Sequence, residues 1–167
     1  IILNNFKNIE LMNLAVSEKD DQTLKLKESK NDWESSLAHL NFDKIYDTVV
    51  KTITIDTIID KNKFENFDLI IKLDIEGYEI KAIEGAFKTI KKYNPLIIIE
   101  FSKFMQSNNN YNLDFFREFL NNFDYSIFDA KFNKSSVDDV VKKLDNLPKS
   151  HYTIGNNFLI KNKSKLE

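Results

Sequence analysis

The sequence of 167 residues predicts a single domain of the α/β class, and three observations lead to this prediction. Two apolar runs, residues 69–73 and 96–99, are typical of strands that are buried in a parallel sheet. Between them, apolar residues recur with the spacing of an amphipathic helix. Strand, helix and strand in this order make a βαβ unit, so we expect a parallel sheet with helices covering both faces.

Composition narrows the class of protein before any motif is considered. Hydrophobic residues make up 42% and charged residues 30% of the chain, which is usual for a globular protein in water. The net charge of −2 argues against a nucleic-acid partner that is bound by a broad basic surface. The absence of cysteine excludes disulfides and zinc–thiolate sites, and it agrees with the cytoplasmic location that we expect. No apolar run reaches the roughly 18 residues of a membrane span.

The N-terminal part reads as three strands and a connection. Residues 9–16 alternate partially and residues 23–27 alternate cleanly between apolar and polar side chains, so both are predicted strands. Residues 49–55 are rich in β-branched side chains and give a third strand. The polar stretch between them, residues 28–47, is expected to be a loop with some helix.

The central part is predicted to contain two helices. A short helix begins at Asp56, whose carboxylate is a plausible N-cap. A longer helix follows residue 79, and the turn Asn94-Pro95 ends it. The strand at residues 96–99 then runs directly into Glu100.

The C-terminal part continues the alternation of helices and strands. The polar residues 106–110 are expected to form a loop. Apolar spacing predicts helices over residues 113–123 and 137–144. Strands are predicted at residues 125–128 and 157–160.

The most informative segment is the turn at residues 72–79, Lys-Leu-Asp-Ile-Glu-Gly-Tyr-Glu, which connects a predicted strand to a predicted helix. Ligands of open α/β sheets bind at the carboxyl ends of the strands, and Asp74 and Glu76 lie at such an end. Glu100 ends the next strand, so we expect it to face the same crevice. The three acids suit either a general base or a divalent cation site, and the sequence leaves both open. The alternative for Asp74 is the N-cap of the following helix.

These residues resemble those of the FkbM-type methyltransferases. The resemblance rests on the turn at residues 72–79, on Ile83-Glu84-Gly85-Ala86, and on the proline-rooted strand of residues 95–100. Weaker segments at residues 13–17 and 54–58 match the family in the same order, so the likeness covers roughly residues 4 to 105. It implies the three-layer, Rossmann-like sheet of S-adenosylmethionine-dependent methyltransferases.

The resemblance also implies that part of this sheet lies outside the chain. The family's first two strands and its glycine-rich cofactor loop are not found in the sequence. We therefore expect residues 1–165 to form a single, N-terminally incomplete domain, and residues 166–167 to be a cloning remnant. Two strand edges would then lack partners, unless upstream residues or a second copy in a homodimer supply them.

The implied activity is methyl transfer from S-adenosylmethionine to an oxygen of a sugar, a glycan or a natural product. In this interpretation Asp74, Glu76 and Glu100 are catalytic, and the backbone of Ala15 and Val16 contacts the adenine of the cofactor. The expected partner is a small-molecule or glycan acceptor, and a divalent cation remains open. The alternative is a non-catalytic module that keeps the methyltransferase fold and acts by self-association.

Overall fold

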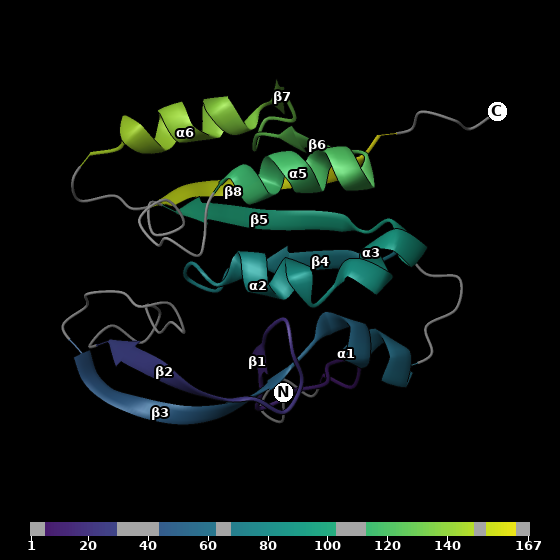
Figure 1. Ribbon diagram of the computed structural model, residues 1–167, viewed down its shortest axis with the longest axis vertical. Coiled ribbons are helices and arrows are strands. Elements are labelled where there is room, and N and C mark those ends of the chain that lie inside the picture. Colours follow the sequence, from purple (N-terminus) through teal and green to yellow (C-terminus); the bar gives the residue numbers. More distant parts are fainter. Residues whose placement is uncertain (1–5, 30–43, 63–67, 103–112, 149–152, 163–167) are drawn as a thin grey trace.

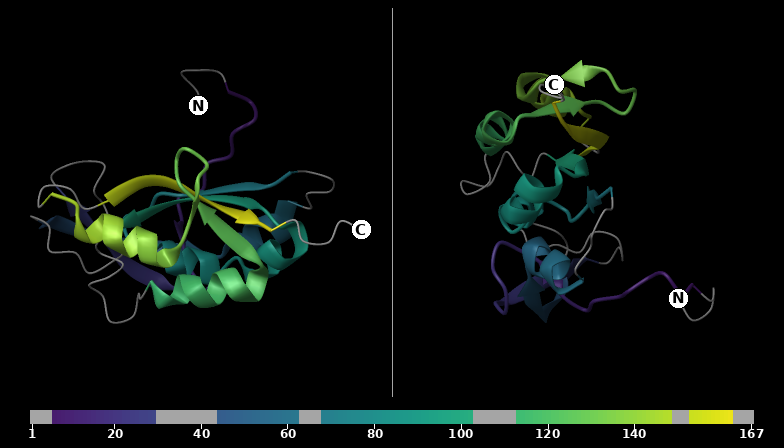
Figure 2. Two further views of the ribbon diagram at one scale, coloured as in Figure 1. Left: turned by 90° about the horizontal axis from the view of Figure 1, so that it is seen from above. Right: turned by 90° about the vertical axis from the view of Figure 1, so that its right-hand side faces the viewer.

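The chain folds into two β-sheets with helices packed against them, as the computed structural model shows (Figures 1 and 2). The smaller sheet has the strand order β1-β3-β2, and the larger one has the order β4-β5-β8-β6-β7. The α/β class is therefore confirmed. The structure describes residues 6–29, 44–62, 68–102, 113–148 and 153–162.

The smaller sheet contains β1 (Ala15–Val16), β2 (Thr23–Ser29) and β3 (Lys44–Ile53). β3 lies between the other two, parallel to β1 and antiparallel to β2. The strand predicted at residues 9–16 is thus shorter than expected, since only Ala15 and Val16 pair. Among the described strands β1 pairs only with β3, at Thr52 and Ile53, the last two residues of that strand.

The connection predicted at residues 28–47 is also shorter than expected. β2 continues to Ser29 and β3 begins at Lys44, because the two strands pair along their length as far as Ser29 and Lys44. The remaining positions, 30–43, lie outside the described residues. At its other end β3 stops at Ile53, two residues before the predicted end.

The larger sheet is mixed, which corrects the expectation of a parallel sheet. β4 and β5 are parallel, whereas β5 with β8, β8 with β6 and β6 with β7 are antiparallel. The apolar runs of β4 and β5 predicted their burial but carried no information on the direction of the later strands. The strands are β4 (Ile70–Leu73), β5 (Leu96–Ser102), β6 (Tyr125–Phe128), β7 (Lys134–Ser135) and β8 (Thr153–Lys161).

Helices cover one face of this sheet, so the prediction of burial on both faces is wrong for the described residues (Figure 2). Every second side chain of β5, among them Ile97 and Ile99, is fully buried against the helices. The alternate side chains Leu96 and Ile98 are only half-buried. On β4, an edge strand, Ile70 is 60% exposed. The covering helices are α2 (Glu79–Glu84), α3 (Phe87–Tyr93), α5 (Asp114–Phe123) and α6 (Val137–Asp145).

The long helix predicted after residue 79 is two helices, α2 and α3, which meet at Gly85. A Cβ atom on Gly85 would lie 2.1 Å from the backbone oxygen of Ser17, so the chain approaches the smaller sheet here more closely than any side chain would allow. The Gly85 carbonyl accepts a hydrogen bond from the Asp56 amide, 2.9 Å away. Asn94 adopts the left-handed conformation and ends α3, as predicted.

Asp56 has a different role from the predicted one. The first helix, α1 (Ile55–Asn62), begins one residue earlier, and the Thr54 hydroxyl accepts from the Thr57 amide. The Asp56 carboxylate instead accepts from the amides of Lys88 and Thr89 at the start of α3. The role of Asp56 depends on the closeness of α1 and α3 in space, which a local capping pattern in the sequence does not show.

The C-terminal elements follow the sequence prediction closely. The predicted helices are α5 and α6, and the predicted strands are β6 and β8. Helix α6 begins with a capping box in which Ser136 and Asp139 exchange hydrogen bonds. The two-residue strand β7 was not predicted, and the loop expected at residues 106–110 lies outside the described residues.

Candidate functional site

The candidate site is built on the turn that joins β4 to α2. Glu76 has φ 53° and Gly77 has φ 93°, so two consecutive residues are left-handed. Such a conformation is ordinary for glycine and uncommon for glutamate. The tight turn places Asp74 and Glu76 at the carboxyl end of β4.

Glu100 enters the site from the neighbouring strand β5. Leu73 and Ile99 are partners in the parallel ladder, so Asp74 and Glu100, which follow them in the sequence, lie at the same edge of the sheet. Glu100 is not at the end of its strand, because β5 continues to Ser102. The register between β5 and β8 shifts between Ile99 and Phe101, so Glu100 lies at an irregularity of the ladder.

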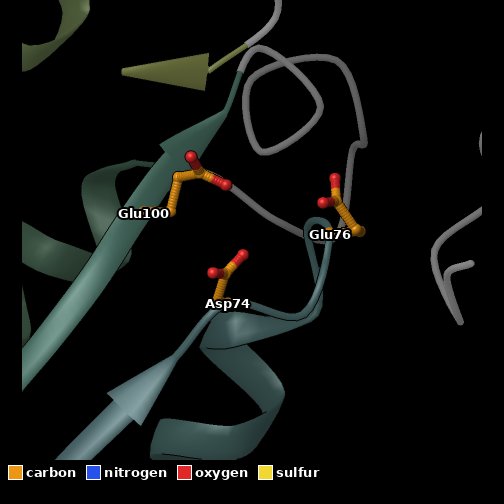
Figure 3. A group of neighbouring side chains, drawn as sticks. All are labelled: Asp74, Glu76 and Glu100. Carbon is orange, nitrogen blue, oxygen red and sulfur yellow. The ribbon is translucent and has the colours of Figure 1, made fainter. Parts of the chain in front are cut away.

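The three acids meet in space (Figure 3). One carboxylate oxygen each of Asp74, Glu76 and Glu100 lies within 4.8 Å of the others. Asp74 is exposed, and the two glutamates are half-buried. The structure therefore brings together the residues that the sequence predicted to share a crevice, while their chemical roles stay predictions.

Asp74 is not the N-cap of the following helix. Helix α2 begins at Glu79, and its N-cap is Tyr78, whose side chain makes no capping hydrogen bond. Instead, the Asp74 carboxylate forms an ion pair with Lys72 Nζ at 2.6 Å, and both side chains are about half exposed. The lysine compensates part of the negative charge of the cluster, and it leaves the Asp74 carboxylate accessible from solvent.

Glu79 belongs to the same turn but was not among the predicted site residues. It is only 1% exposed, and burial raises the pKa of its carboxyl to about 7, against the opposing effect of backbone hydrogen bonds. The negative charge of Glu100 raises this pKa further. Its Oε1 accepts from the Ile75 amide at 3.1 Å, whereas Oε2 is buried and has no hydrogen-bond partner among the described residues. The signal was its spacing, since Glu79 lies on the same helical stripe as the buried Ala82 and Ile83.

The acid cluster suits two kinds of chemistry. A carboxylate can take up a proton from a hydroxyl group that hydrogen-bonds to it. Carboxylate oxygens are also the ligands that Mg²⁺ and Ca²⁺ prefer, and three of them converge here. Exposed acidic groups gather without a cation in many proteins, so the spacing alone does not choose between the two.

The residues predicted to contact the adenine lie elsewhere. Ala15 and Val16 form β1 in the smaller sheet, where they pair with Thr52 and Ile53 of β3. Both side chains are half-buried. The structure does not place them among the three acids, which belong to the larger sheet.

Comparison with known protein families matches residues 3–127 to the methyltransferase FkbM domain. The chain belongs to the FkbM methyltransferase family. The FkbM match includes the turn that follows β4 and Glu100, and it leaves α6 and β8 outside. Comparison with curated proteins and with solved structures gives no significant match. None of the helices in the described part of this FkbM chain is long and apolar enough to cross a membrane.

Proposed function

We propose that this FkbM-family protein transfers a methyl group from S-adenosylmethionine to a hydroxyl oxygen of a sugar, a glycan or a natural product. The observation that carries the proposal is the convergence of Asp74 and Glu76, which follow the end of β4, with Glu100 of the parallel strand β5. Crevices at this edge of α/β sheets are where ligands bind. The family match supports the class of reaction, and the three acids support a polar acceptor.

Each acid has a defined task in this proposal. S-adenosylmethionine, when bound, supplies a methyl group on a positively charged sulfur. Asp74 or Glu100 takes the proton of the acceptor hydroxyl as its oxygen bonds to the methyl carbon and the carbon–sulfur bond breaks. Glu76 accepts a hydrogen bond from the acceptor and orients it, because in-line geometry decides the rate of such a transfer. Three carboxylates also make the crevice negative, which is compatible with a sulfonium ion.

Ala15 and Val16 are the residues that we propose for the adenine. Their side chains are small or β-branched and half-buried, and their backbone belongs to a paired strand. A rigid backbone edge of this kind can hydrogen-bond a base without any charged side chain. Substituting Val16 by Ala is therefore expected to weaken cofactor binding less than removing an acid weakens transfer.

Calorimetry with S-adenosylmethionine tests the cofactor, and transfer of a labelled methyl group to a panel of sugars and hydroxylated natural products tests the reaction. We expect both Asp74→Asn and Glu100→Gln to retain cofactor binding. Whichever of the two residues is the general base, its substitution should lower the transfer rate by about 10²–10⁴-fold. Asp145→Asn, an exposed acid on α6, is the matched control. The measurement should include any upstream sequence that the gene encodes, and absence of cofactor binding there contradicts the proposal.

A divalent cation is the second role open to the same acids. Titration with Mg²⁺ and Mn²⁺, followed by removal with EDTA, separates the two roles. Transfer that persists in EDTA assigns the acids to proton uptake and acceptor binding. Transfer that is lost in EDTA and restored by Mg²⁺ assigns them to a cation.

A non-catalytic module that self-associates is the alternative function. The observation that favours it is the pair of sheet edges at β1 and β4, each of which has one partner strand among the described residues. Open strand edges are templates for pairing with another chain. A stable dimer in light scattering, together with absence of cofactor binding, would support this alternative.

A further inference from the structure

The buried carboxyl group of Glu79 is attached to the turn that carries the acids. Glu79 is the first residue of α2 and is 1% exposed. Its Oε1 accepts a hydrogen bond of 3.1 Å from the Ile75 amide, which belongs to the peptide bond between Asp74 and Ile75. The bond therefore fixes the peptide plane that directly follows Asp74 and precedes Glu76.

A second hydrogen bond of the turn also involves Ile75, through its carbonyl oxygen. The backbone bond from the Tyr78 amide to the Ile75 carbonyl is long, at 3.4 Å. Glu76 holds a left-handed conformation, which is strained for a residue other than glycine and persists only if its surroundings enforce it. The Glu79 carboxyl group supplies such a constraint from inside the fold.

A glutamate placed only to stabilise a helix N-terminus would have no reason to be buried. First-turn acids act on the helix dipole while they are solvated. Glu79 is instead removed from water, and its Oε2 finds no hydrogen-bond partner in the described part of the chain. A buried polar atom of this kind lowers stability, so a gain at the neighbouring site is the better account of its presence.

We propose that Glu79 is a positioning residue, which holds the turn so that Asp74 and Glu76 converge with Glu100. The inference rests on the proposed function, because it explains how the geometry of those three acids is maintained. Glu79 itself takes no part in the chemical step. Its hydrogen bond to the Ile75 amide acts through Asp74 and Glu76, on either side of that amide.

NMR spectroscopy of the wild-type chain without cofactor gives the first test. The Ile75 amide proton should shift with the same midpoint as the side-chain carboxyl carbon of Glu79 when the pH is raised, since the amide donates to that group. An Ile75 amide that does not follow the Glu79 titration would overturn the proposal. This test needs no variant, so it does not depend on any variant's ability to fold.

Variants give the second test. Glu79→Gln keeps an acceptor oxygen, and we expect Ile75 amide exchange and the titration midpoints of Asp74 and Glu76 to stay close to wild type. Glu79→Ala removes the acceptor, so exchange at Ile75 should become about tenfold faster, the equivalent of one hydrogen bond, and both midpoints should move. Leu144→Ala, in the remote helix α6, is a destabilised control that should leave these signals unchanged.

The outcomes separate a positioning role from a purely structural one. If Glu79→Ala lowers stability without changing Ile75 exchange and the two midpoints, Glu79 only supports the core and the proposal fails. The proposal also fails if Leu144→Ala changes them equally. None of these measurements requires S-adenosylmethionine. If the chain does not bind the cofactor, the proposed function fails, but the role of Glu79 in the turn can still be tested.

Discussion

The carboxyl group of Glu79 is removed from water, and the free energy of this burial depends on pH. The neutral form is tolerated in the interior, whereas the ionised form loses its hydration. The pKa of the carboxyl is about 7 in the folded protein, compared with 4.5 for an unperturbed glutamate. The protonated and ionised forms of this residue therefore coexist near neutral pH, next to the acids of the candidate site.

We expect Glu79 to make the protein less stable as the pH rises from about 4.5 to 7. The folded protein keeps this proton over a range in which the unfolded chain has lost it, so the contribution is complete below pH 4.5 and is gone above pH 7. At 1.4 kcal/mol per pH unit, the change in the free energy of unfolding is roughly 3 kcal/mol.

Urea denaturation of the wild type and of Glu79→Gln at pH 5 and pH 8 measures this effect. The stability difference between the two proteins should shift in favour of the variant at pH 8. The comparison cancels contributions from Asp20, Asp129 and Asp139, whose pKa values are lowered by hydrogen bonds. Equal pH dependence in both proteins would show that Glu79 is not buried as described.

The meeting of Asp74, Glu76 and Glu100 could be predicted from the sequence, because the acids come directly after two apolar runs. These runs lie in register in the parallel strands β4 and β5, so the residues after them lie at the same edge, although β5 itself continues to Ser102. Burial of Glu79 could not be read in this way, because a first-turn glutamate is normally exposed. Its environment is decided by what packs on α2.

At the scale of elements, the N-terminal amides of helix α3 are capped by a residue of another helix. Its own N-cap, Ala86, provides no side-chain hydrogen bond. Asp56 of α1 supplies two, with Oδ1 accepting from the Thr89 amide at 2.7 Å and Oδ2 from the Lys88 amide at 3.2 Å. A carboxylate at this end also interacts favourably with the helix dipole.

Asp56→Ala should therefore destabilise the protein by about 1–2 kcal/mol, the usual effect of removing a capping side chain. Asp60→Ala, at an exposed position of the same helix, is the matched control and should change stability by about 0.5 kcal/mol at most. Thermal or urea denaturation of the three proteins measures both. Equal losses in the two variants would contradict the capping role.

Sequence patterns predicted the elements best where local signals suffice. Helix α6 has its capping box and apolar stripe within its own residues, and it forms as expected. The segment predicted at residues 9–16 has a strand pattern, but of its residues only Ala15 and Val16 pair with β3. Helix periodicity likewise did not reveal the break at Gly85, which follows from the approach of Ser17.

At the scale of the whole molecule, the two sheets are connected where α2 and α3 meet the smaller sheet. Gly85 packs against the backbone of Ser17 and accepts a hydrogen bond from Asp56. Lys81 of α2 adds an ion pair with Glu18, with Nζ 3.7 Å from the carboxylate. These contacts belong to residues that are far apart in sequence, and they hold the smaller sheet against the helices of the larger one.

Gly85→Ala should destabilise the protein by about 3 kcal/mol, at the upper end of the range for overpacking, because the new Cβ meets backbone that cannot rotate away. Gly155→Ala is the matched control, since nothing lies within 4 Å of its Cβ position. Hydrogen exchange should show weaker protection of both Thr52 in β3 and Ile97 in β5 in Gly85→Ala. Loss of protection in one sheet only would show that the sheets unfold independently.

The sequence by itself determined the α/β class, the FkbM-family motif in the turn after β4, and the meeting of Asp74, Glu76 and Glu100. These features follow from the periodicity of apolar residues within single segments and from the pairing of two neighbouring parallel strands, β4 and β5. Only the tertiary structure decided the mixed sheet, the cap that Asp56 provides to α3, and the burial of Glu79. Each of these depends on which distant segments pack together, and packing is a property of the whole chain.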